Sequence, residues 1–77
     1  MLVIHTFLYR KGGEYGFKNI DEVCHDFLAH NLNYINSVDC SRKVLYSMGV
    51  KVVERDKNTF MVVSDISIEE LKAKYFN

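Results

Sequence analysis

Four side chains that commonly bind metal ions lie within a short stretch of the chain, at Cys24, His25, His30 and Cys40. Zinc sites usually take their ligands in close pairs such as Cys-x2-Cys or His-x3-His, because one turn of chain must present both to the same ion. That spacing is absent here, and on a helix Cys24 falls on the apolar face while both histidines fall on the polar face. We therefore expect no metal and no other cofactor, and interpret the cysteines as free thiols.

An acid–base couple is the second chemical possibility, since Asp26 and His30 are one helical turn apart. No nucleophile or second carboxylate stands at a recognisable spacing from this pair, so the pattern is weak support for catalysis. The Gly12-Gly13 pair lacks the following helix of a phosphate-binding loop and is typical of a hairpin turn. Cys40 could have a lowered thiol pKa near the start of the second helix. Its position on the apolar face of that helix instead favours an inert thiol in the core. We expect a protein that is not an enzyme.

One helix must position most of these residues. Asn19 is suited to cap its N-terminus and Glu22 to complete a capping box. Apolar residues then recur at helical spacing and make one face: Ile20, Val23, Cys24, Phe27, Leu28, Leu32 and Ile35.

The other expected strands are a central strand at 2–9, a short return strand at 14–18 and a β-hairpin of strands 50–55 and 59–64. The other expected helices are a second helix at 39–48 that ends at Gly49 and a C-terminal helix at 68–76 with a Ser67–Glu70 capping box. The order β-β-α-α-β-β-α predicts one α+β domain over residues 1–77, with a mostly antiparallel sheet and helices on one face.

Composition narrows the possible functions. The chain has 77 residues, ten Lys/Arg against ten Asp/Glu, and 48% apolar residues. Balanced charge removes the overall basic field of a nonspecific nucleic-acid binder, and the apolar share predicts a packed core. The longest apolar run is far short of the about 20 residues of a membrane helix, and Arg10 and Lys11 follow the first apolar stretch, the reverse of a secretory signal. We expect a cytoplasmic protein with no membrane partner.

Small size also favours self-association. A core of this size rarely supplies more than about 3–5 kcal/mol of net stability, so a homodimer or another homo-oligomer is expected, with residues 59–63 as the exposed sheet edge. The chain has no proline and is biased toward Lys, Asn, Ile, Tyr and Phe. Such a bias is typical of short reading frames of AT-rich genomes and bacteriophages, which makes a phage origin a hypothesis.

Nucleic-acid binding is the alternative function. The stretch from Ser41 to Val63 resembles the second half of a winged helix-turn-helix domain, in which a recognition helix is followed by a two-stranded wing. The resemblance covers about a third of the chain. It implies that the contacts to nucleic acid come from five basic residues: Arg42, Lys43, Lys51, Arg55 and Lys57. A strand opens the chain where that family has a helix, and Glu54 and Asp56 interrupt the basic tip.

Binding to another protein is the remaining class. Tyrosine offers a large contact area with a polar tip. Four tyrosines are therefore candidate contact residues: Tyr9, Tyr15, Tyr34 and Tyr46. Each of them can instead be a half-buried core residue. We therefore expect a small non-enzymatic regulatory or accessory protein that binds, and thereby inhibits, another protein.

Overall fold

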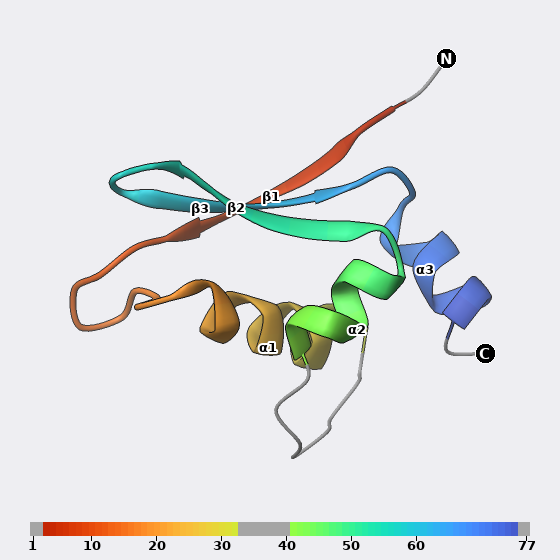
Figure 1. Cartoon of the computed structure of the whole chain (residues 1–77), viewed down its shortest axis with the longest axis horizontal. Coiled ribbons are helices and arrows are strands. Elements are labelled where there is room, and N and C mark those ends of the chain that lie inside the picture. Colours follow the sequence, from red (N-terminus) through yellow and green to blue (C-terminus); the bar gives the residue numbers. More distant parts are fainter. Residues whose placement is uncertain (1–2, 33–40, 76–77) are drawn as a thin grey trace.

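The fold is a three-stranded antiparallel sheet with helices on one face. A computed structural model describes residues 3–32 and 41–75. The elements are β1 (His5–Arg10), α1 (Ile20–Asn31), α2 (Ser41–Ser47), β2 (Val50–Asp56), β3 (Thr59–Ser64) and α3 (Ile68–Tyr75). The strand order is β1-β3-β2, and α1 and α2 lie on the same side of the sheet while α3 lies beyond one end (Figure 1). The predicted α+β class is confirmed.

The core lies between the sheet and the helices. Alternate residues of each strand point to opposite faces, and on the covered face Phe7, Val62 and Val52 stand in one row across the three strands. The ring of Phe27 on α1 packs on Phe7 with ring centroids 5.2 Å apart. The other fully buried apolar side chains come from all three helices and from β2 and β3, among them Val23, Leu28, Leu45, Val50 and Leu71.

The helix ends follow their sequence signals. The side chain of Asn19 accepts a hydrogen bond from the backbone N–H of Glu22 at 2.9 Å, so the predicted N-cap is confirmed. The Glu22 carboxylate reaches back to the N–H of Lys18 at 2.7 Å, where the capping box predicted Asn19 as its partner. Gly49 follows α2 with φ +80°, which confirms it as the left-handed residue that ends this helix. The expected start of that helix at residues 39–40 lies outside the described residues.

Three details of the predicted sheet are wrong. The first strand, expected to be central, is an edge strand because only β3 pairs with it. Residues 14–18 form turns, with an isolated bridge between Lys11 and Phe17 in place of a return strand. Three glycines in five residues curl the chain too tightly for an extended ladder. Residues 59–63 are not an edge, since β3 pairs with β1 on one side and with β2 on the other. The local hairpin was visible in the sequence, but the long-range pairing that makes it central was not.

Candidate protein-binding site

The loop between β1 and α1 presents one tyrosine to solvent. Two backbone hydrogen bonds close the loop, from the N–H of Gly12 to the carbonyl of Phe17 and from the N–H of Phe17 to the carbonyl of Arg10, both at 2.9 Å. Gly12 and Gly13 adopt φ of +68° and +72°, which favours glycine. At the loop's far end, Gly16 packs so closely that a Cβ there would overlap the carbonyl oxygen of Gly12. Tyr15, held in this closed loop, is 91% exposed.

Lys11 ties the base of the loop to the neighbouring hairpin. Its N–H donates to the carbonyl of Asn58 at 2.8 Å. Its ammonium lies 3.0 Å from a carboxylate oxygen of Glu54 on β2 and 4.8 Å from the centre of the Phe60 ring. The ion pair and the cation–π contact act on the same side chain, which is mostly buried along its stem. The loop therefore starts from a fixed point on the sheet.

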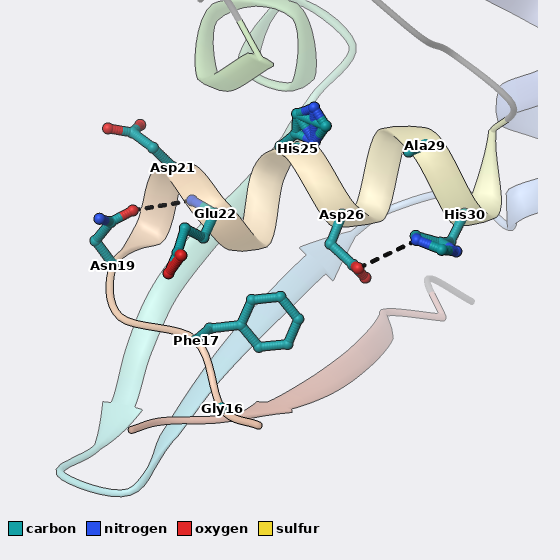
Figure 2. A pocket seen from close by; sticks show the side chains of 9 residues that line it. All are labelled: Gly16, Phe17, Asn19, Asp21, Glu22, His25, Asp26, Ala29 and His30. Atoms are coloured by element: carbon teal, nitrogen blue, oxygen red, sulfur yellow. Dashed lines mark hydrogen bonds and ion pairs between the residues drawn. The ribbon is translucent and has the colours of Figure 1, made fainter. Parts of the chain in front are cut away.

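A shallow hollow of about 560 Å³ lies beside this loop, along the outer face of α1. Figure 2 shows its lining, with Phe17 between the loop and the helix. The helix contributes Asp21, Glu22, His25, Asp26, Ala29 and His30, and the loop side contributes Gly16, Phe17 and Asn19. A smaller hollow of about 250 Å³, within residues 10–16, adjoins it through Gly16. The lining carries three carboxylates and no lysine or arginine, so its charge is negative when the histidines are neutral.

The predicted Asp26–His30 couple is present in this hollow. His30 Nε2 lies 3.4 Å from Asp26 Oδ1, and the histidine side chain is 74% exposed. A solvated pair of this kind is worth little as a tuned acid–base group. The hollow contains no Ser, Thr, Cys or Lys that could serve as a nucleophile. The geometry offers a contact surface, and the expectation of a non-enzymatic protein stays a prediction.

Two titratable groups are drawn into the core. Burial raises the pKa of the Cys24 thiol to about 11, against its ordinary 9.0, although nearby Arg42 acts in the opposite direction. Burial, with the charge of Asp26, raises the pKa of Tyr9 to about 12. Asn31 Nδ2 donates to the Tyr9 hydroxyl at 3.5 Å, and the tyrosine ring packs edge-on against Phe17. These groups are protonated and structural at neutral pH.

The tyrosines predicted as contact residues have different environments. Tyr9 is half-buried in the core, Tyr15 is almost wholly exposed, and Tyr46 is exposed on α2. Tyr34 lies outside the described residues. The sequence did not indicate Tyr75 on α3 as a contact residue, and its side chain is 40% exposed. The carboxylates beside the loop, for which the polar face of α1 was the available signal, were also missed.

The five basic residues proposed for nucleic acid lie in three separate places. Arg42 and Lys43 lie on α2, against the covered side of the sheet, and Arg42 Nε pairs with Asp21 at 3.3 Å. Lys51 points to the opposite face of the sheet, because it alternates along β2 with the buried residues Val50 and Val52. Arg55 and Lys57 lie at the hairpin tip, at the far end of β2 from α2 (Figure 1). The structure does not gather them on one surface, and the nucleic-acid alternative stays an untested prediction.

Within residues 3–32 and 41–75, no three His, Cys, Asp or Glu side chains converge as a metal site would require. Of the metal candidates, Cys24 is buried with a free thiol, His25 and His30 are exposed, and Cys40 lies outside these ranges. None of the helices in the described part of the chain has the length and apolar character needed to span a bilayer. Comparison with protein families, with curated proteins and with solved structures finds no match to this chain.

Proposed function

We propose that this chain is a small cytoplasmic, non-enzymatic regulatory or accessory protein, encoded by a phage, that acts by binding another protein. The contact surface is the Tyr15 loop together with the acidic hollow beside it. Inhibition of the bound protein is the simplest consequence for a domain that brings no catalytic group of its own. The observation that carries the proposal is the 91% exposure of Tyr15 on a loop closed by backbone hydrogen bonds.

A tyrosine held in this way is suited to anchor an interface. Tyrosine is enriched among the few residues that dominate binding energy, with losses of 2 kcal/mol or more on truncation to alanine. Ordering a mobile side chain on binding costs about 0.5–1.5 kcal/mol, and a preformed loop reduces the additional cost of ordering the backbone. The positive φ angles of Gly12 and Gly13 and the close approach of Gly16 supply that order before any partner arrives.

The charge beside the loop defines the chemistry of the partner. Glu22 and Asp26 line the hollow within reach of a segment that docks on Tyr15, and Asp21 is only partly offset by Arg42. A basic segment, with Lys or Arg next to a pocket for an aromatic ring, complements this surface. Electrostatic complementarity of this kind chiefly raises the association rate and selects the partner.

A capture experiment with matched tyrosine variants tests the proposal. The immobilised protein is exposed to lysate of the cell that produces it, in three forms: unchanged, Tyr15→Ala and Tyr75→Ala. Both variants remove an exposed tyrosine, but Tyr75 lies on α3 rather than on the loop. We expect the unchanged chain and Tyr75→Ala to retain a protein with a basic surface. Tyr15→Ala is expected to retain at least tenfold less of that protein. Equal retention by all three forms would contradict the proposal.

A second variant separates loop order from the tyrosine itself. Gly16→Ala keeps Tyr15 but forces its new Cβ against the Gly12 carbonyl, so the loop must open. We expect capture to weaken while the circular dichroism spectrum stays that of the folded chain. Capture that is unchanged in this variant would show that loop order has no part in binding.

A further inference from the structure

The face of the sheet away from the helices has an apolar row at its centre and is uncovered by any described element. One row across this face consists of Leu8, Met61 and Val53, which are paired through the register of the three strands. Leu8 is 59% exposed and Val53 is 39% exposed, while Met61 between them is partly buried. Figure 1 shows α1 and α2 on the other side of the sheet only. Sheets normally bury an apolar face against a second layer.

Charged and polar residues flank this apolar row in an ordered way. Toward the hairpin tip, the next row is Arg10, Thr59 and Asp56. Asp56 has one oxygen bound to the N–H of Asn58 and the other 4.0 Å from Arg55, so this exposed carboxylate can still accept a further cation. In the opposite direction, the next row is Thr6, Val63 and Lys51. The cation Arg10 and the anion Asp56 thus stand on the two outer strands of one row.

We propose that a second copy of this chain covers the open face and forms a two-fold symmetric dimer whose axis runs parallel to β3. This rotation places β1 of each copy over β2 of its partner and keeps every row opposite itself. Leu8 then faces Val53 of the second copy, Met61 faces its own equivalent, and Arg10 faces Asp56 twice. The apolar row is buried and two ion pairs form at its border.

The other face-to-face two-fold axis runs across the strands and fits less well. It would place the row of Thr59 over the row of Val63, which sets Asp56 against Lys51 but leaves Arg10 over Thr6 and a hydroxyl over an apolar side chain. The axis along β3 instead stacks Val63 on Val63 and continues the apolar contact of Met61. Two sheets packed in this way keep their strands within about 30° of each other, as twisted sheets do.

The size of the face sets the strength of the contact. Three strands about 4.8 Å apart, paired over six residues of about 3.4 Å each, make a face of roughly 15 by 20 Å, or roughly 300 Å² in projection. Stable interfaces bury about 800 Å² of accessible surface per partner, so this one belongs at the weak end. The dimer is therefore expected to be weak and reversible.

Sedimentation measurements test the dimer and its axis. They cover protein concentrations of about 1 to 500 μM, a range suited to the dissociation constants of weak complexes. We expect a monomer–dimer equilibrium that Leu8→Asp weakens at least tenfold. The matched pair Arg10→Glu and Lys51→Glu reverses one positive charge each on the same face. Arg10→Glu sets a glutamate against Asp56 and is expected to weaken the dimer severalfold, whereas Lys51→Glu faces Thr6 and has little effect. A larger effect from Lys51→Glu would overturn the proposed axis.

Cysteine cross-linking gives a second measurement that does not depend on affinity. Met61→Cys and Val63→Cys place thiols next to the axis but on sheets about 10 Å apart, too far for a direct disulfide, so both are expected to be joined by a short bifunctional thiol reagent. Thr6→Cys lies on the same face but away from the axis, and is expected to link no faster than the unchanged chain. A strictly monomeric chain at 500 μM, as the upper limit of that range, a dimer unaffected by Leu8→Asp, or equal linking at all three positions would overturn the proposal.

Discussion

Alkaline pH should destabilise this fold through one buried thiol. Cys24 lies on the apolar face of α1, fully buried, and burial raises its pKa from 9.0 to about 11. In the unfolded chain the thiol ionises near pH 9, but in the folded chain it keeps its proton until about pH 11. The unfolded state therefore binds fewer protons between these values, so the free energy of unfolding falls as pH rises. Below pH 9 the contribution is fully present.

The expected size follows from the same two values. A pKa difference of about two units corresponds to roughly 2 to 3 kcal/mol when the transition is complete, of which about 1.3 kcal/mol is lost between pH 8 and pH 10. Tyr9, whose pKa is raised to about 12 from 10.0, adds roughly 0.4 kcal/mol of loss by pH 10 and the rest above it. The window from pH 8 to pH 10 therefore reports mainly on Cys24.

Urea unfolding followed by circular dichroism at pH 8, 9 and 10, at one protein concentration, measures this effect. The control is Cys24→Ala, which lowers stability at every pH by leaving a small cavity but removes the titrating group. From pH 8 to pH 10, we expect the free energy of unfolding of the unchanged chain to fall by about 1.3 kcal/mol relative to that of the variant. Parallel stability curves for the two chains would refute the reasoning, because they would show that the thiol does not titrate differently in the folded state.

Two further predictions concern the alternative function and the helix cap. At physiological salt we expect negligible affinity for DNA or RNA, and Lys43→Ala with Lys57→Ala should leave nucleic-acid retention unchanged. A submicromolar complex whose log K falls steeply with log salt would instead favour nucleic-acid binding over protein binding. Asn19→Ala removes the acceptor for the Glu22 N–H and should cost about 1 kcal/mol in urea unfolding. A stability equal to that of the unchanged chain would mean that water replaces the cap fully.

The sequence was informative where the signal is local. The apolar spacing from Ile20 to Leu32, the cap at Asn19 and the stop at Gly49 each depend on neighbours within one or two turns, and the structure confirms them. The β2–β3 hairpin was predicted on the same basis. The curled loop at residues 12–16 was not, because the close approach of Gly16 to Gly12 depends on tertiary geometry that a pair of adjacent glycines does not reveal.

Features that depend on long-range pairing could not be predicted in this way. The strand at residues 2–9 was predicted to be central, but β1 is an edge strand, Leu8 on it is exposed, and only the side of Phe7 and Tyr9 is packed. The central place of β3 follows from its pairing with β1, more than forty residues away in the chain. Of the predicted tyrosines, only the exposure of each in the structure separates Tyr15 from Tyr9.

Photo-cross-linking in the cell that produces the protein tests the central claim most directly. A photoreactive phenylalanine analogue replaces Tyr15 in one chain and Tyr75 in another, so that the same group reports from the loop and from α3. We predict that position 15 cross-links to one protein with a basic surface, that position 75 does not, and that neutralising Glu22 and Asp26 reduces the product. No product at position 15 above that at position 75 would contradict the account that the Tyr15 loop is a protein-binding surface.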